Sequence, residues 1–384
     1  MDIRPPRKPA QRPAGSEAAP EGMLPQPVVD AELTTPSIDP SNPKRPRRRL
    51  LVMLACLITA VVAALCAASV AWYSWAISPA SEEPTSVRVV VAPGDTSVSI
   101  AEVLHEHDLI RSRLAFNLYT QLSGTRSKLQ AGGYVLSANQ SVATIVEHMT
   151  SGKTDELNIT ILPGMTLAEL RERFKQDGFS DDEIDIAFNA TYNHPLLATM
   201  PAGATLEGYL YPETYRMNAD QTLQALFERV FDEMYDTLQE KKYLEEFAKR
   251  KLTIHQAVTL ASIVQKEVTD PVDQKQVAQV FLRRYSEGIQ LGSDVTYMYA
   301  AEQTGAKASP SLDSPYNTRK YVGLPPGPIS NMNPSALEAV AFPAPGDFLY
   351  FVAGDGPDEG KTFFAHTEAE HNANIAAHCR VLCQ

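Results

Sequence analysis

The sequence is poor in cysteine, with four among 384 residues. Cys56 and Cys66 fall in an uncharged run, whereas Cys379 and Cys383 stand four apart near the C-terminus, beside His378. So few cysteines exclude a scaffold built on disulfides. A zinc site at the C-terminus would need further ligands close by. We therefore expect no metal, and we expect Cys379 and Cys383 to pair on one helix face.

Several catalytic motifs are missing as well. The sequence contains neither an HExxH zinc helix nor a GxSxG nucleophile elbow. The SGKT run at Ser151–Thr154 is not a phosphate loop, because Glu147 occupies the position of the upstream glycine. Ser262 lacks the lysine three residues later that a penicillin-type enzyme has. Nucleophilic serine or cysteine catalysis therefore has little support, and nothing indicates a cofactor.

Positive charge is scarce outside the N-terminus. The formal net charge is −12, yet residues 1–49 carry nine Lys or Arg against six Asp or Glu. Residues 50–77 carry no charge, so the rest of the chain holds a net charge of about −15. An acidic main body argues against nucleic acid as a partner.

The N-terminal part is predicted to form a disordered tail followed by a membrane anchor. Residues 1–49 hold eleven of the 28 prolines and little periodic apolar pattern, which is typical of disorder. They end in the basic run KRPRRR. The uncharged stretch 50–77 is long enough for one transmembrane helix and longer than the apolar core of a signal peptide. The positive-inside rule predicts a single-pass protein of the cell membrane, with a cytoplasmic tail and an extracytoplasmic body.

Two stretches about seventy residues apart repeat one pattern, namely VRVVVAPGDTSVSIAEVL and LNITILPGMTLAELRERF. In each, a β-rich run meets Pro-Gly-x-Thr and then an amphipathic helix, with the turns at Pro93–Thr96 and Pro163–Thr166. Pro-Gly favours a turn, and Thr166 with Glu169 predicts a capping box. The first unit continues as a β-α-α-β module over residues 87–155. It resembles a LysM-like carbohydrate-binding module. The alternative that it is a spacer domain without a ligand stays open.

The remaining chain predicts an α+β fold with antiparallel strands. Residues 156–250 form an intermediate α+β subdomain, and residues 251–384 form the C-terminal domain. Within that domain we expect the helices and strands at these positions: helices over 252–268, from Pro271 to Gly288 with Asp270 as N-cap, and from Glu368 to about Leu382; strands at FLYFVA and TFFA.

A glutamate stands at the end of the apolar helix LASIVQKEV, residues 260–268. One face of this helix carries an apolar stripe made of Ile254, Ala257, Val258, Ala261, Val264 and Val268. Helical phase places Glu267 at the edge of the stripe, whereas Lys266 shares an outward face with Thr259 and Ser262. Burial raises the pKa of a carboxyl group, as a general acid requires. An exposed Glu267, or one paired with an arginine, stays open.

Further motifs follow in order along the chain: EGYLYPETY (Glu207–Tyr215), LASIVQKEV, LGSDVTYMYA (Leu291–Ala300), SPYNTRKYVGLPPGPISN (Ser314–Asn331) and KTFFAHTEAEHN (Lys361–Asn372). Together they resemble the YceG-like endolytic murein transglycosylase family, over nearly the whole extracytoplasmic part. The resemblance implies a LysM-like module followed by a catalytic domain, residues 251–384, that cuts peptidoglycan glycan strands internally.

By this resemblance the catalytic glutamate of the family falls on Glu267. The usual Glu-Lys-Glu of the family is Gln265-Lys266-Glu267 here, and Val295 replaces a common proline. A single catalytic Glu suits a lytic reaction, which leaves 1,6-anhydro-MurNAc ends and would terminate glycan elongation. Candidates for binding the sugar or stabilising the oxocarbenium-like state are Asp294, Tyr316, Asn317 and Glu207, followed by His366, His371 and Asn372.

Two other functions stay open. One is a membrane-tethered scaffold that binds peptidoglycan with a degenerate site. The other is a muramidase that uses two carboxylates, Glu267 and Asp294, and leaves reducing ends. Cell-wall synthases or division proteins are the protein partners to consider, and the sequence does not identify one.

Overall fold

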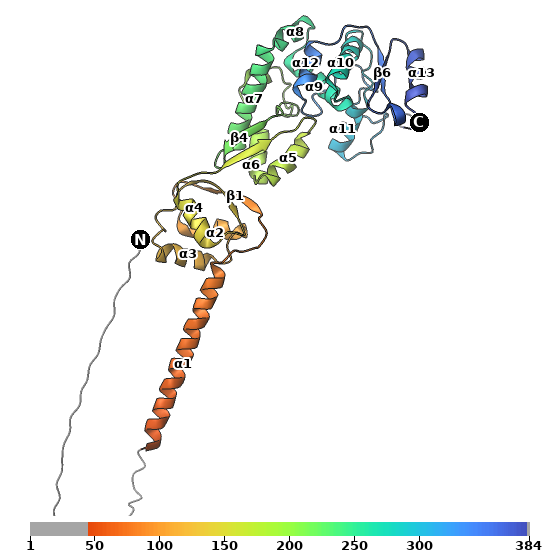
Figure 1. Cartoon of the computed structure of the whole chain (residues 1–384). Coiled ribbons are helices and arrows are strands. Elements are labelled where there is room, and N and C mark those ends of the chain that lie inside the picture. Colours follow the sequence, from red (N-terminus) through yellow and green to blue (C-terminus); the bar gives the residue numbers. More distant parts are fainter. Residues whose placement is uncertain (1–44, 382–384) are drawn as a thin grey trace, which may run out of the picture. The chain divides into compact units, whose positions relative to one another are not determined.

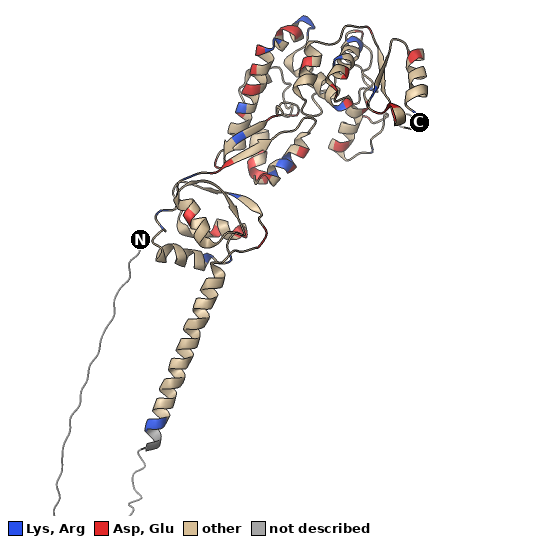
Figure 2. Cartoon of the chain, viewed as in Figure 1, with Lys and Arg blue, Asp and Glu red and all other residues tan. Residues whose placement is uncertain are grey.

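A computed structural model of the chain describes residues 45–381, so the predicted tail lies outside the described residues except for its last five. The first helix, α1, spans Arg45–Ala76. Its segment Arg48–Ala76 is long and apolar enough to cross a membrane. Figure 2 shows charged residues only at the N-terminal end of α1. The helix therefore covers the predicted span, residues 50–77, except for its last residue.

A β-α-α-β unit follows, as predicted. Its elements are β1 (Ser86–Val91), α2 (Ser97–Glu106), α3 (Arg113–Leu122) and β2 (Gly132–Ser137), followed by α4 (Val142–Thr150). β1 pairs antiparallel with β2, with Val89 opposite Tyr134. Thr96 caps α2 through a capping box. The strand and helix order is thus confirmed, while carbohydrate binding by this unit stays a prediction.

The second repeat is more complete than the sequence suggested. It consists of β3 (Glu156–Thr160), α5 (Leu167–Gln176), α6 (Asp181–Asn189) and β4 (Thr214–Asn218), with the short 3-10 helix η1 (Pro195–Leu197) before the last strand. β3 pairs antiparallel with β4, and Thr166 caps α5 through the predicted box with Glu169. Both repeats therefore have the order β-α-α-β. The sequence indicated only the first strand, turn and helix of the second.

The C-terminal part is built around one buried helix. Its elements are α7 (Leu223–Glu240), α8 (Tyr243–Lys249), α9 (Ile254–Glu267), α10 (Pro271–Ser286), α11 (Asp294–Thr304), α12 (Pro334–Ala341), β5 (Tyr350–Ala353), η2 (Gly356–Asp358), β6 (Thr362–Ala365) and α13 (Glu368–His378). α8, α10, α11 and α12 pack around α9 (Figure 1). Strands of the described chain pair as three two-stranded antiparallel sheets, which confirms the α+β class.

The last helix ends earlier than predicted. α13 stops at His378, and Cys379 has left helical geometry, with φ −127° and ψ 79°. The Asp355 carboxylate draws the chain away, because it accepts hydrogen bonds from the backbone N–H groups of Arg380 and Val381. The prediction that Cys379 and Cys383 share a helix face is therefore wrong for Cys379. Cys379 is disulfide-bonded, and Cys383 lies outside the described residues.

Gly208 allows the loop before β4 to meet the loop before α12. Its φ is +81°, and a Cβ there would lie 2.4 Å from Cβ of Pro328. We expect Gly208→Ala to lower the free energy of unfolding by about 1–3 kcal/mol, through overpacking and backbone strain. Thermal unfolding followed by circular dichroism measures the loss.

Gly327→Ala is the matched control, because the nearest atom to its added Cβ would lie 3.5 Å away. It should change the free energy of unfolding by no more than about 0.5 kcal/mol. Equal melting temperatures for Gly208→Ala and the unmodified chain would contradict the close packing at Pro328.

Candidate active site

The helix α9 carries the predicted catalytic residue at its last position. Thr253 caps its N-terminus through a capping box with Gln256, and Val268 ends it in extended geometry. The predicted phase is confirmed at the end of the helix. Lys266 is exposed and donates from Nζ to the carbonyl of Gly164 at 3.3 Å, whereas Glu267 is partly buried.

The face that Lys266 shares with Thr259 and Ser262 is not exposed throughout, which corrects the sequence analysis. Both hydroxyl residues are buried. Ser262 Oγ accepts from the N–H of Ile329 at 3.0 Å and donates to the carbonyl of Thr259 at 2.7 Å. A hydroxyl can be buried when it bonds backbone groups in this way. The segment around Ile329 therefore covers a face that helical phase alone assigned to solvent.

Gln265 also has a structural role. It is buried, and its Oε1 accepts from the backbone N–H of Asn333 at 2.9 Å. Asn333 is in turn the N-cap of α12. The amide that replaces the first acid of Glu-Lys-Glu thus ties α9 to the start of α12, and Glu267 is the remaining acid of this run.

Glu267 opens onto a cleft of about 680 Å³. The cleft lies between the C-terminal end of α9, the loop before α11, strand β5 and helix α13. Its lining includes four residues predicted from the sequence, namely Glu267, Asp294, His371 and Asn372, and four that were not, namely Arg284, Arg319, Tyr350 and Glu368.

The carboxyl group of Glu267 is set up to hold a proton near neutral pH. Burial raises its pKa to about 7. The hydroxyl of Ser293 donates to Oε1 at 2.5 Å and opposes this shift, because it favours the charged form. The charge of Asp294 raises the pKa further, and that of Arg319 lowers it. Burial is the largest of these effects.

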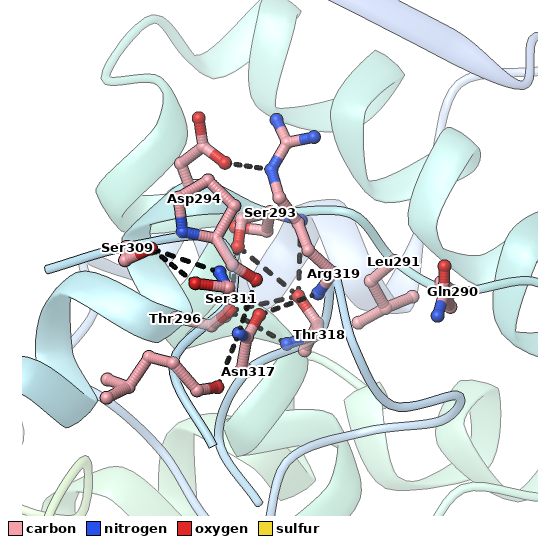
Figure 3. Close-up of polar contacts among 12 residues, drawn as sticks. Gln290, Leu291, Ser293, Asp294, Thr296, Ser309, Ser311, Asn317, Thr318 and Arg319 are labelled. Carbon is pink, nitrogen blue, oxygen red and sulfur yellow. Dashed lines mark hydrogen bonds and ion pairs between the residues drawn. The ribbon is translucent and has the colours of Figure 1, made fainter. Parts of the chain in front are cut away.

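Asp294 and Arg319 form an ion pair at the rim of the cleft (Figure 3). Asp294 is the first residue of α11, and Arg319 comes from the predicted SPYNTRK loop. The bond to Asp294 raises the pKa of Arg319. Because the pair is nearly neutral as a whole, it presents polar groups to the cleft without a large net charge.

Other residues of the cleft combine aromatic and cationic groups. The guanidinium of Arg284 lies 4.9 Å from the ring centre of Tyr350, and it donates to the carbonyl of Leu291 at 2.8 Å. The ring of His371 stacks on Tyr350 with centres 5.2 Å apart. Burial and the nearby charges of Arg284 and Arg319 lower the pKa of His371. A neutral imidazole and an aromatic ring suit contact with a sugar.

Glu207 lies away from this cleft, in the buried interior. Its two oxygens accept from the N–H of Leu167 at 3.2 and 3.1 Å, and Oε2 also accepts from the Tyr299 hydroxyl at 3.2 Å. The carboxyl thus ties the start of α5 to α11. Tyr316 packs on Tyr299, with ring centres 5.1 Å apart. A role of Glu207 and Tyr316 in binding sugar stays a prediction, and their contacts favour support of the fold.

Asn317 is wholly buried. Its Nδ2 donates to the carbonyls of Pro310 and Leu312 at 2.9 and 2.8 Å, and its Oδ1 accepts from the N–H of Arg319 at 3.1 Å (Figure 3). This side chain holds the loop that presents Arg319. Binding of sugar by Asn317 itself stays a prediction.

The last candidate, His366, is exposed and pairs with Asp347 and Glu370. It is not among the residues that line the cleft. Within residues 45–381, no group of three or more His, Cys, Asp or Glu side chains is arranged to hold a metal ion.

The buried Glu207 makes stability depend on pH. Burial raises its pKa from the ordinary 4.5 to about 7. Between these values the folded chain binds more protons than the unfolded chain, so the free energy of unfolding falls as pH rises. Glu207→Gln should therefore show a smaller drop in melting temperature between pH 5 and pH 8. The exposed Glu302→Gln is the control, and parallel curves for Glu207→Gln and the unmodified chain would contradict the assignment.

Comparison with known proteins agrees with this architecture. The model of the YceG-like family matches residues 89–377. An endolytic murein transglycosylase of Bacillus subtilis (strain 168) is 30% identical over 319 residues, which cover 76% of this chain and 84% of the relative. A protein of the same name from Streptococcus pneumoniae serotype 2 (strain D39 / NCTC 7466) is 30% identical over 325 residues, which cover 76% of this chain and 58% of the relative.

A solved structure is similar as well. The crystal structure of a yceG-like protein from Listeria monocytogenes has a TM-score of 0.50 and 30% sequence identity, covering 75% of this chain and 98% of the other. The family match spans well over half of the sequence and includes the helix, the loops and the cleft described above. The chain belongs to the YceG-like family.

Proposed function

We propose that this chain is an endolytic lytic transglycosylase of peptidoglycan, with Glu267 as its acid and base. One observation carries the proposal. A single carboxyl group whose pKa is raised to about 7 opens onto a cleft of about 680 Å³. The two relatives described above are named endolytic murein transglycosylases, which supports the substrate class.

In the first step the protonated Glu267 donates its proton to the glycosidic oxygen between MurNAc and GlcNAc. The bond from this oxygen to C1 of MurNAc breaks, and GlcNAc leaves with a hydroxyl group. Positive charge develops at C1 as an oxocarbenium-like state. A group with a pKa near the working pH is suited to this transfer, because it is protonated often enough and still gives up its proton.

In the second step the Glu267 carboxylate takes the proton from the 6-hydroxyl of the same MurNAc. The oxygen O6 then bonds to C1 and closes a 1,6-anhydro ring. Glu267 is protonated again, and no water is consumed. One residue therefore serves in turn as acid and base, so the reaction requires no second carboxylate.

The alternative muramidase reaction needs a second carboxylate as nucleophile or base. Asp294 was the candidate, but it is ion-paired with Arg319. This pairing lowers its ability to attack C1 or to activate water. We assign Asp294 and Arg319 instead to binding the polar groups of the sugar, together with Tyr350, His371 and Asn372, which also line the cleft.

The proposal includes the location of the enzyme. Helix α1 would anchor it in the cell membrane, and the basic residues at the N-terminal end of this helix would keep the N-terminus in the cytoplasm. The catalytic domain would then meet nascent glycan strands outside and release them as a terminase. The first β-α-α-β unit is the proposed LysM-like glycan-binding module.

Glu267→Gln should lower the rate of cleavage by at least about 100-fold, since it removes the acid and the base while keeping the size of the side chain. Mass spectrometry of purified glycan strands, incubated with the full chain in detergent, counts the 1,6-anhydro ends. The control Glu302→Gln removes an exposed carboxyl on α11 and should retain the rate. Anhydro ends formed at the original rate by Glu267→Gln would overturn the assignment.

A scaffold protein without activity would behave differently in the same assay. It would bind glycan strands, and the unmodified chain would release no anhydro ends. Reducing ends in place of anhydro ends would identify a muramidase.

The catalytic efficiency should decrease on the alkaline side of the pH profile. Because Glu267 must enter the first step protonated, kcat/KM should fall as pH rises through about 7. Initial rates on purified glycan strands measure the profile. A kcat/KM that stays constant up to about pH 9 would show that the proton comes from another group.

A further inference from the structure

The Glu267 carboxyl receives one hydrogen bond from the described part of the chain, and that bond comes from Ser293. The distance from Ser293 Oγ to Oε1 is 2.5 Å. Ser293 is 2% exposed, immediately before the first residue of α11. Its side chain makes no bond to the start of α11, although it stands at the N-cap position where serine usually does so. The hydroxyl is therefore used for Glu267 in place of a helix cap.

Two threonines hold Ser293 in place, and we call Thr296 and Thr318 the hydroxyl clamp (Figure 3). The N–H of Ser293 donates to Thr318 Oγ1 at 3.1 Å, and its carbonyl accepts from Thr296 Oγ1 at 2.7 Å. The two threonine hydroxyls lie 2.9 Å apart and bond each other. Both residues are fully buried. A hydroxyl both donates and accepts, so the clamp satisfies both backbone groups of Ser293.

We propose that Ser293, fixed by the hydroxyl clamp, is a positioning residue that directs the acidic proton of Glu267 to Oε2. The inference rests on the proposed function and deepens it. Among the described residues, Ser293 Oγ has no acceptor other than Oε1. Turning its hydrogen away would leave a buried donor unpaired, at a cost in free energy. Oε1 is thus occupied as an acceptor in both protonation states, and Oε2 is the oxygen that carries the proton.

Other charged groups around Glu267 do not supply this function. Asp294 and Arg319 face it from α11 and the loop after Asn317, but they pair with each other, and their effects on Glu267 are opposed. Lys266 on the same helix bonds Gly164. The remaining titratable groups of the cleft are Arg284, Tyr350, Glu368 and His371. Ser293 contacts Glu267 and carries no charge. Removing its hydroxyl therefore tests the positioning of the Glu267 proton without changing the net charge of the cleft.

Infrared difference spectroscopy tests the inference on the full chain in detergent. The protonated carboxyl band of Glu267 is assigned as the band lost in Glu267→Gln, and its intensity is followed against pH. Ser293→Ala should move the midpoint upward by about one pH unit, because the hydroxyl favours the charged form. Ser311→Ala, which removes an exposed serine hydroxyl from a nearby loop, should leave the midpoint unchanged. An unshifted midpoint in Ser293→Ala would overturn the inference.

Kinetics supply the second readout. Ser293→Ala should lower kcat on glycan strands by about tenfold with KM within about twofold, since the reacting proton is misdirected. Ser293→Thr keeps the hydroxyl and should restore part of the lost rate. An unchanged kcat in Ser293→Ala would contradict the inference.

The two arms separate this inference from the proposed function. The infrared midpoint requires no substrate, so it tests Ser293 even if the unmodified chain forms no anhydro ends. Absence of those ends would overturn the proposed function alone. A substitution that merely unfolds the chain around Glu267 would expose its carboxyl and move the midpoint downward, toward the ordinary 4.5, which is opposite to the expected shift.

Discussion

Burial of one carboxyl group at the end of an apolar helix is the constraint on which the site depends. α9 is buried along most of its length, so its last residue has a fixed place. The same packing that orders the helix removes water from Glu267 and raises its pKa to about 7. If Glu267 is the acid of the proposed reaction, stability and catalysis have one cause, because the core that holds α9 also raises the pKa of Glu267.

The surrounding loops supply the groups that modify the pKa of Glu267. The loop before α11 brings Ser293, and the following loop brings Arg319, which Asn317 holds through its buried amide. The second β-α-α-β unit takes part as well. The N–H of Gly164 in its turn donates to the carbonyl of Asn331 at 2.8 Å, and Lys266 bonds that same glycine. The corresponding turn of the first unit, around Gly94, is exposed. The turn of the second repeat thus bonds the C-terminal part of the chain, while the turn of the first repeat is exposed.

Helical periodicity, turn residues and caps were enough to predict much of this fold. The capping box of Thr166, the Asp270 cap and the phase that separates Glu267 from Lys266 are local features, and the structure confirms them. Periodicity could not show that the Ile329 segment covers Thr259 and Ser262, because this contact joins residues far apart in the chain. The early end of α13 at His378 has the same cause, because Asp355, which bonds the backbone after the helix, is far from it in the sequence.

The site itself could be predicted only in part. Glu267 stood out because an acid at the edge of an apolar stripe is unusual. The cleft also contains Arg284, Arg319 and Tyr350, which carry no distinctive spacing and meet only through tertiary packing. Ser293 gave a faint signal as a serine just before Asp294, yet that pattern predicts an ordinary helix cap. Glu207, chosen as a site candidate, is buried and links α5 to α11, and its role in binding sugar stays a prediction.

The central claim is that the chain cuts glycan strands without consuming water. The most direct measurement is digestion of purified glycan strands in ¹⁸O-labelled water, followed by mass spectrometry of the new MurNAc ends. The account predicts ends that carry no ¹⁸O and are lighter by one water molecule than a reducing end. Incorporation of one ¹⁸O atom at each new end would contradict it and would identify a hydrolase.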